Sequence, residues 1–126
     1  MPDKEWQKLN LPETSTYIEF PIAFTGQPKN GKATVFTGLL LSCQFILAII
    51  HTMNKAFKKP ALLLYDYFVE EFGMSKETVS AALKELRARK IIEQVKRSHY
   101  KIKVSYNKGD HLEIDSYMFK QLWNVG

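Results

Sequence analysis

The sequence has few of the residues that build cross-linked or repetitive proteins. It contains one cysteine, Cys43, so no disulfide can form within the chain, and we expect the reducing cytoplasm as its compartment. Its six glycines and five prolines are too few for a collagen-like or low-complexity chain. Hydrophobic residues make up 45% and charged residues 25% of the 126 residues, which is the composition of a globular protein about one domain in length.

Patterns for metal binding, nucleophilic catalysis and phosphate-binding loops are also missing. Cys43 and His51 lie eight residues apart on a predicted helix, and the other two histidines fall in or beside turns, which matches no recognised metal-ligand spacing. Gly26 and Gly31 are not followed by the Lys-Ser or Lys-Thr pair of a phosphate-binding loop. We therefore expect no enzyme activity, no metal and no small-molecule cofactor.

Residues 33–54 contain no Lys, Arg, Asp or Glu, and lysines flank both ends of this run. A run of this length can cross a bilayer, but a glycine and several polar residues interrupt it. Apolar residues recur with helical spacing at Ile46, Ile49, Ile50 and Met53. We therefore predict a helix over residues 42–57 that packs in a core, and no membrane span. Phe45 and Leu47 lie beside this apolar face, which predicts either a homodimer interface or packing by the terminal helix around Trp123.

Two segments near the N-terminus have the composition of strands. Residues 1–16 are polar and without periodicity, so we expect a flexible tail. Residues 17–24 and 33–36 are rich in aromatic and β-branched side chains, and Asn30-Gly31 between them is a strong turn signal. These features predict an N-terminal strand or hairpin, and Pro21 favours an edge position in it.

Two helices are predicted in the middle of the chain. The first covers residues 61–72, with Pro60 preceding its first turn, and ends at Gly73. The second begins after Ser75, a good N-cap residue, and fades near residue 90. Together with the helix over residues 42–57 they can form a three-helix core.

Strands and a last helix are predicted in the C-terminal part. Residues 91–96 and 100–106 have strand patterns and are separated by three residues, which predicts a tight hairpin. Residues 112–114 are expected to add a third antiparallel strand. Asp115 is expected to cap a helix over residues 116–123, which offers for burial Met118, Phe119, Leu122 and Trp123. The predicted fold class is α+β, with one domain over residues 17–126.

Residues 68–86, FVEEFGMSKETVSAALKEL, carry a recognisable pattern. Gly73 permits a tight turn, Ser75 caps the second helix, and Val79 and Leu83 pack that helix on the first. With the basic hairpin that follows, this stretch resembles the winged helix-turn-helix superfamily, although Val69 stands where alanine is typical. The resemblance covers about half of the chain. It implies a winged-helix, DNA-binding domain of a transcription regulator, and the chain also looks like the N-terminal domains of plasmid and phage replication initiators.

In such a unit the second helix enters the major groove of double-stranded DNA, and its outward N-terminal residues reach the base edges. The candidate base-reading residues are therefore Ser75, Lys76, Glu77, Ser80, Ala81 and Lys84. Residues suited to contact phosphates, which position the protein without reading sequence, are Thr78, Arg87, Arg97, His99, Lys101 and Lys103.

The charge distribution agrees with this hypothesis. Residues 76–108 contain ten lysines and arginines and three glutamates, which gives this segment a net charge of +7. The rest of the chain has a net charge of −2. A polyanion or an acidic protein surface is the natural partner of this third of the chain. The alternative function is therefore a winged-helix module for protein interaction without DNA contact. The sequence leaves open the choice between regulator and initiator, the DNA site and any effector.

Overall fold

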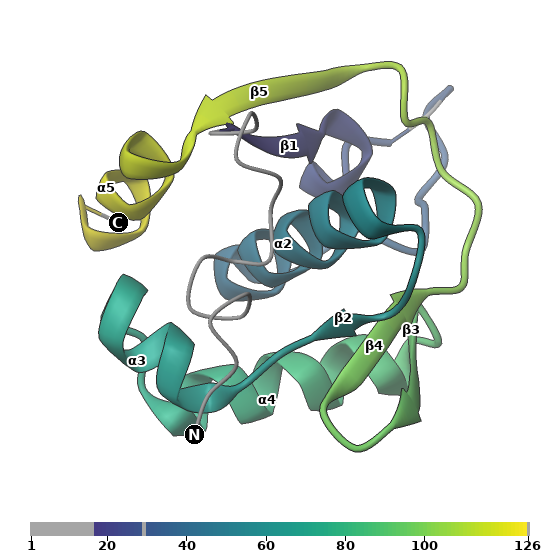
Figure 1. The fold of residues 1–126 in the computed structure, drawn as a ribbon. Coiled ribbons are helices and arrows are strands. Elements are labelled where there is room, and N and C mark those ends of the chain that lie inside the picture. The colour runs from purple at the N-terminus through teal and green to yellow at the C-terminus, as the bar shows by residue number, and fades with distance from the viewer. Residues whose placement is uncertain (1–16, 29, 126) are drawn as a thin grey trace.

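Helix α2 (Leu41–Phe57) runs through the middle of the molecule, with other elements above, below and at its end (Figure 1). A computed structural model describes residues 17–28 and 30–125, so the predicted N-terminal tail lies outside the described residues. Ile46, Leu47, Ile49 and Ile50 are fully buried. A helix that is apolar on several faces is stable in water only when it is covered on all of them. The prediction of a core helix over residues 42–57 is confirmed.

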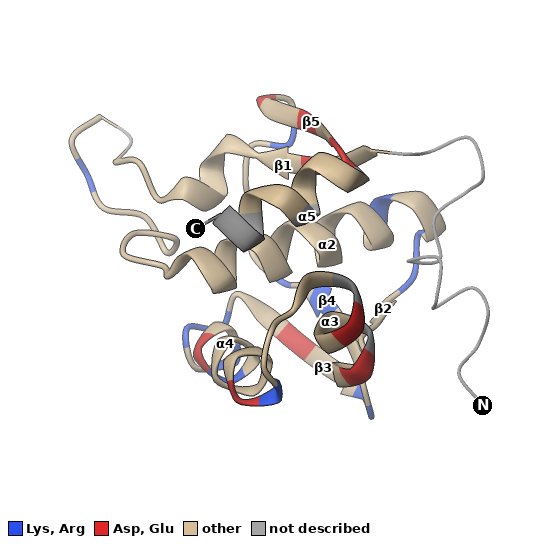
Figure 2. Cartoon of the chain, turned by 90° about the vertical axis from the view of Figure 1, so that its left-hand side faces the viewer, with Lys and Arg blue, Asp and Glu red and all other residues tan. Residues whose placement is uncertain are grey.

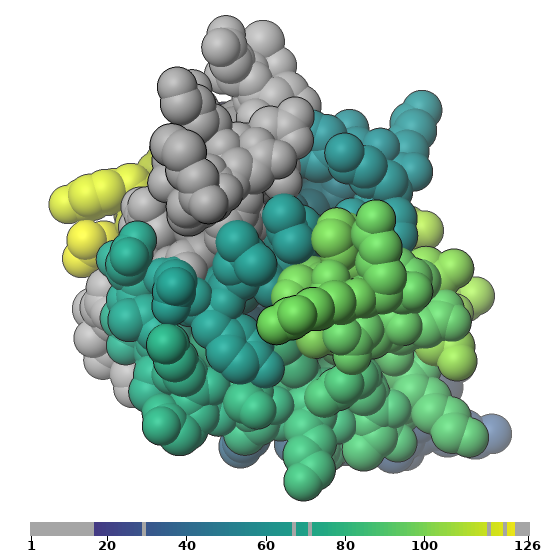
Figure 3. Space-filling view, turned by 60° about the horizontal axis from the view of Figure 1, so that its bottom comes forward, coloured from purple at the N-terminus to yellow at the C-terminus, as the bar shows by residue number. Residues whose placement is uncertain are grey.

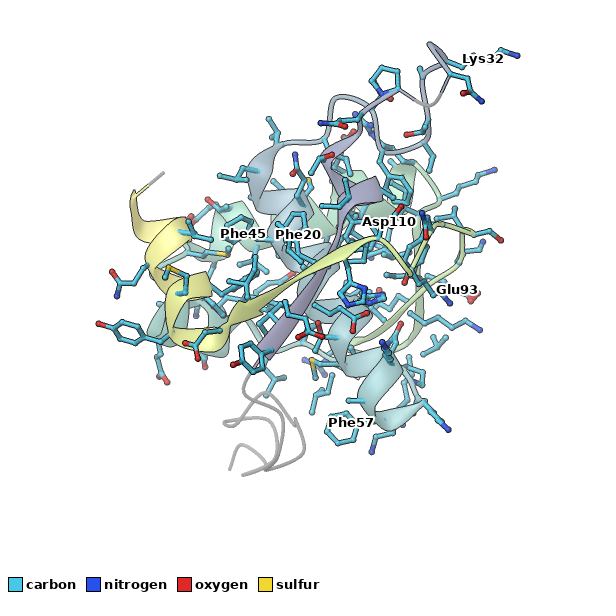
Figure 4. The ribbon with its side chains drawn as sticks, turned by 90° about the horizontal axis from the view of Figure 1, so that it is seen from above. Phe20, Lys32, Phe45, Phe57, Glu93 and Asp110 are labelled. Carbon is cyan, nitrogen blue, oxygen red and sulfur yellow. The ribbon has the colours of Figure 1, made fainter. Side chains whose placement is uncertain are left out.

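A two-stranded antiparallel ribbon covers one side of α2. It joins β1 (Tyr17–Pro21) to β5 (His111–Asp115), with Tyr17 opposite Asp115. Ile18 and Phe20 point from β1 into the core, where Phe20 meets Phe45 of α2 at 6.1 Å between ring centroids (Figure 4). The N-terminal strand is thus confirmed. No strand of the described residues pairs with its other edge, so the amide that Pro21 lacks costs no ladder bond there.

The predicted N-terminal hairpin is wrong. Asn30 and Gly31 do adopt positive φ angles of 54° and 75°, but the strand predicted over residues 33–36 is absent and β1 pairs with the distant β5 instead. After β1 the chain forms the 3-10 helix η1 (Ile22–Thr25) and then leads Phe36 into the core, where its ring packs 5.3 Å from that of Phe24. The buried Phe36 side chain, and not strand pairing, therefore holds this segment against the core.

The layer below α2 contains two helices and a three-stranded antiparallel sheet. Its elements are β2 (Ala61–Leu62), α3 (Tyr65–Phe72), α4 (Lys76–Ala88), β3 (Ile92–Lys96) and β4 (His99–Ile102), and the strand order is β2-β4-β3. Gly73 ends α3 with φ of 69°, and its amide donates to the Val69 carbonyl at 3.1 Å. Ser75 accepts from the Thr78 amide at 3.1 Å and so caps α4, as predicted.

Two predicted boundaries in this layer are wrong, the start of α3 and the end of β4. Residues 61 and 62 pair with Tyr100 and His99 of β4, so α3 begins only at Tyr65 and Pro60 precedes a strand. Strand β4 ends at Ile102, because the chain beyond it leaves the sheet and Tyr106 packs against the ring of Phe24 instead. The antiparallel strand predicted over residues 112–114 is present as β5, but it pairs with β1 on the other side of α2 and does not extend the hairpin.

Helix α5 (Ser116–Val125) closes the end of the core. The Asp115 carboxylate accepts from the Tyr117 amide at 2.9 Å, which confirms the predicted cap. Phe119 is fully buried and its ring lies 4.6 Å from that of Phe45. Met118 and Leu122 are 54% and 45% exposed, so their predicted burial is wrong, and the Trp123 side chain lies outside the described residues.

The additional apolar faces of α2 are therefore covered within the chain, by β1 and by α5. Phe45 and Leu47 are both buried, so they no longer favour a homodimer interface, and the homodimer stays a prediction. The fold class is α+β, with helices and antiparallel sheets around a shared hydrophobic core. Within residues 17–28 and 30–125, no helix combines the length and the apolar character that a bilayer crossing requires.

Candidate nucleic-acid interface

Helix α4 lies at the surface with one face buried. Val79, Leu83 and Leu86 are fully buried against the core. All six side chains predicted to read bases are exposed, namely Ser75, Lys76, Glu77, Ser80, Ala81 and Lys84. The hydrophobic spacing therefore gave the correct orientation of the helix. Helices α3 and α4 and the β3–β4 hairpin form one continuous face of the molecule (Figure 3).

The first turn of α4 uses two of the predicted contact residues for its own stability. The Ser75 hydroxyl donates to the Thr78 hydroxyl at 2.9 Å, while Ser75 Oγ accepts from the Thr78 amide. Thr78 is half-buried. Lys76 Nζ lies 3.5 Å from a carboxylate oxygen of Asp66, but both side chains are more than half exposed, so this ion pair is weak and a phosphate can replace it.

One flank of α4 adjoins the loop of residues 33–40. Arg89 donates from Nη1 to the Thr37 carbonyl at 2.7 Å and from Nε to Glu85 at 2.7 Å. Between this loop and the helix lies a hollow, lined in part by Gly38, Leu40, Ala81 and Glu85. Arg89 is thus engaged in holding the loop, and Thr78 lies on this same flank.

The other flank of α4 adjoins the hairpin. The Arg87 guanidinium donates from Nη1 to Gln94 Oε1 at 2.9 Å. The hairpin turns at Arg97 and Ser98, where Ser98 has φ of 62°. Arg87 and Arg97 both line an open hollow between α4, the hairpin and the start of α3. Two of the predicted phosphate contacts therefore lie together beside the helix.

The remaining predicted phosphate contacts of the hairpin lie elsewhere. Successive side chains of a strand point to opposite faces, and Tyr100 is buried towards the core. His99 and Lys101 therefore lie on the opposite face, where Lys101 Nζ is 3.7 Å from Glu93 Oε1. His99 Nδ1 lies 2.7 Å from the Arg97 carbonyl oxygen, and Lys103 is exposed just beyond β4. The predicted set of six is divided between two faces.

Acidic and basic residues alternate along the ribbon of α3, α4 and the hairpin (Figure 2). Acidic residues come from α3 as well as α4, and they include Asp66, Glu70, Glu77 and Glu85. Seven cations of the basic third form no ion pair with any residue in the described part of the chain, namely Lys84, Arg87, Lys90, Lys96, Arg97, Lys103 and Lys108. They supply the uncompensated positive charge of this region.

A buried polar cluster on the far side of α2 was not predicted from the sequence. His51 is 2% exposed, and its Nδ1 lies 2.6 Å from the Tyr106 hydroxyl while its Nε2 lies 2.7 Å from Glu19 Oε1. Lys55 Nζ binds the other oxygen of Glu19 at 2.7 Å. Glu19 and Tyr106 come from segments distant from α2, so the local sequence around His51 carried no signal for the cluster.

The pKa shifts in this cluster indicate one protonation state. Burial lowers the pKa of His51 despite the opposing effect of Glu19, and burial raises the pKa of Tyr106 to about 12. Burial alone raises the pKa of Glu19, but the hydrogen bonds and charges of Lys55 and His51 outweigh it and the net pKa is lowered. A neutral His51 with its proton on Nε2 then donates to the Glu19 carboxylate and accepts from the Tyr106 hydroxyl. The cluster is a satisfied structural network.

Groups for metal or nucleophilic chemistry do not converge in the described part of the chain. No three His, Cys, Asp or Glu side chains there are placed to hold a metal ion. Cys43 is buried in the core, and burial raises the pKa of its thiol, which disfavours the reactive thiolate.

The sequence reasoning also missed three lysines near Lys101. Lys55, Lys58 and Lys59 line the same hollow as Lys101, on the side of the hairpin away from α4. Their closeness in sequence was visible, but their position beside β4 depends on Asn54, whose side-chain oxygen accepts from the Ile102 amide at 3.3 Å.

In comparisons with known proteins, no family model matches this chain, and no curated protein or solved structure matches it.

Proposed function

We propose that the protein binds double-stranded DNA as a winged-helix domain, with α4 as the recognition helix and the β3–β4 hairpin as the wing. The observation that carries the proposal is the position of the most basic third of the chain. It folds into an exposed helix and an adjacent hairpin, which Arg87 and Gln94 join at 2.9 Å. Three helices followed by a hairpin is the element order expected of this fold.

In this proposal the exposed side of α4 enters the major groove. Lys76 and Lys84 donate to guanine acceptors, and Ala81 contacts a thymine methyl. The Ser80 hydroxyl donates a hydrogen bond to a base edge or accepts one from it. Glu77 accepts from cytosine. Ser75 contributes through the cap that it provides, because its hydroxyl already bonds Thr78.

The phosphate contacts in this proposal come chiefly from Arg87 and Arg97, which line one hollow beside α4. Lys103 and the other unpaired cations add a more distributed attraction. Lys101 and His99 lie on the other face of the hairpin, so they contact the backbone only if the duplex wraps around the turn.

The test is a fluorescence-anisotropy titration of the full chain with a random-sequence duplex at several salt concentrations. If about five phosphates are neutralised, the logarithm of the association constant falls against the logarithm of salt concentration with a slope of roughly −4.5. A flat response would overturn the proposal and favour a module that binds another protein. Selection of bound fragments from a random duplex pool then separates a regulator or initiator with a defined site from a non-specific binder.

A further inference from the structure

A second basic hollow lies on the other side of the hairpin from α4. It has a volume of about 530 Å³, and five lysines contribute to its lining: Lys55, Lys58, Lys59, Lys101 and Lys108. They come from three separate segments, the end of α2, the strand β4 and the chain that leads to β5. Among the described residues, no carboxylate lines this hollow. Its position therefore brings together cations that the sequence keeps apart.

The hollow is held in place by one side chain at its base. Asn54 donates to the Lys59 carbonyl at 3.2 Å and to the Tyr100 carbonyl at 3.4 Å, and its oxygen accepts from Ile102. These bonds fix the last turn of α2 against β4. The lysines on both elements are thus presented from a fixed backbone.

The positive charge of the hollow is only partly balanced. Lys55 binds Glu19 at 2.7 Å and Lys101 lies 3.7 Å from Glu93, while Lys58 has no ion pair within the described residues. Lys108 lies 5.3 Å from the centre of the Tyr106 ring. Five lysines and two glutamates leave a local surplus of three positive charges, which repel one another until an anion neutralises them.

Lys58 also has an unfavourable backbone conformation. It terminates α2 with φ of 54°, and its amide donates to the Asn54 carbonyl at 2.7 Å. Glycine is the usual residue at this position because a side chain is strained there. Lys58 therefore adds a charge to an already repulsive cluster from a backbone conformation that is itself unfavourable.

We propose that this hollow binds a small polyphosphate anion, such as the phosphate chain of a nucleotide. Lysine ammonium groups bind phosphate as point charges, and several separate lysines match an anion that carries several charges. The volume lies within the range of about 300 to 1,000 Å³ that is usual for small-molecule sites. Pro60, Ile102 and Val104 supply an apolar wall for the organic part of the ligand. The proposal is independent of DNA binding by α4.

The experiment is isothermal titration calorimetry of the full chain with inorganic tripolyphosphate, ATP and adenosine. We expect saturable binding of tripolyphosphate and ATP and none of adenosine. The double variant Lys59→Gln/Lys101→Gln should bind tripolyphosphate at least roughly tenfold more weakly, because it loses two ammonium–phosphate contacts. The matched control Lys32→Gln/Lys96→Gln removes the same charge at two exposed positions outside the lining of the hollow and should bind as the wild type does. The absence of saturable binding, or an equal loss in the control, overturns the proposal.

A second variant gives a readout that does not depend on the double variant being folded. Lys58→Gly relieves both the strain and the repulsion, so it should raise the melting temperature while it weakens tripolyphosphate binding. A raised melting temperature with unchanged binding contradicts the proposal.

Duplex DNA carries the same phosphate chemistry, and a parallel anisotropy titration separates the two sources. If tripolyphosphate does not bind but Lys59→Gln/Lys101→Gln weakens duplex binding, the hollow belongs to the DNA interface and the small-ligand site is wrong. If tripolyphosphate binds and no duplex does, this inference stands and the proposed function fails.

Discussion

The Arg87 guanidinium of α4 donates to the Gln94 side-chain oxygen of β3 at 2.9 Å, and this bond ties the surface helix to the hairpin. Arg87 Nε also points to the Leu83 carbonyl within its own helix, at 3.4 Å. The guanidinium is thus oriented from both sides. A helix and a hairpin that contact the same duplex need a fixed relative position, and this pair of residues provides it.

Replacing Gln94 with alanine tests that role without changing any charge. Gln94→Ala should lower the free energy of unfolding by only about 0.5 to 1 kcal/mol, because the lost bond is exposed. Duplex affinity should nevertheless fall, since the hairpin and Arg87 are no longer held. Urea denaturation and anisotropy measure the two quantities. Gln121→Ala, at an exposed position on α5, is the matched control and should leave duplex affinity unchanged.

The two faces of the hairpin should differ in their effect on DNA binding. Arg97→Ala should weaken binding to all duplexes and make the salt slope less steep by about one, because one phosphate contact is lost. Lys101→Ala should have a smaller effect, since Lys101 lies on the opposite face and next to Glu93. Anisotropy titrations over a range of salt concentrations compare the variants. Equal effects would contradict the docking of the duplex on the α4 side.

The elements around α4 were predictable because their determinants are local. Val79, Leu83 and Leu86 repeat with helical spacing, and a single serine and a single glycine mark the ends of adjacent helices. The alternation of buried Tyr100 with exposed Lys101 also contained the signal that the hairpin cations divide between two faces. These cations were nevertheless predicted as one set of phosphate contacts.

The pairing of distant strands was not predictable in the same way. The composition of β1 indicates a strand, but alternation alone does not identify a partner more than ninety residues away. Proline favours the first turn of a helix, and this local preference led to a wrong prediction at Pro60. The pairing of residues 61 and 62 with β4 determines the backbone conformation there. The hollow with Lys58 and Lys59 beside Lys101 depends on this tertiary arrangement.

Acid should destabilise the protein through His51. Its pKa is lowered from the ordinary 6.5, chiefly because burial disfavours the imidazolium. Below pH 6.5 the unfolded chain therefore binds a proton at this histidine that the folded chain does not yet bind. The free energy of unfolding decreases as the pH is lowered. Glu19 adds to this loss at lower pH, because its pKa is lowered from 4.5 in the folded state and the stability that it contributes disappears as it is protonated.

Urea denaturation at a series of pH values measures this dependence. His51→Gln retains a donor and an acceptor but cannot titrate, so it should flatten the profile between pH 6.5 and the range in which Glu19 titrates. Gln121→Ala, which removes no titratable group, serves as the control and should keep the slope of the wild type. A variant at position 51 with the wild-type slope would show that another group carries the dependence.

Two glycines test the path of the loop beside α4. A Cβ at Gly26 would lie 2.5 Å from the Phe36 carbonyl oxygen, and φ there is 77°. Gly31 has nearly the same φ, 75°, but an added Cβ there would have no atom of the described residues within 4 Å. Gly31→Ala should therefore cost about 1 kcal/mol of unfolding free energy from backbone strain alone, and Gly26→Ala about 3 kcal/mol. Equal costs in thermal denaturation would contradict the close approach of residues 26 and 36.

The most direct test of DNA docking is a residue-level map of the bound surface. Backbone amide chemical shifts of the labelled full chain are recorded by NMR as a duplex is added. The account predicts that the largest changes fall at Ser80, Lys84 and Arg97, with little change at Lys32 or along β5. Changes concentrated on β5 and α5, or no change at α4, would contradict the claim that this helix and hairpin form the DNA-binding face.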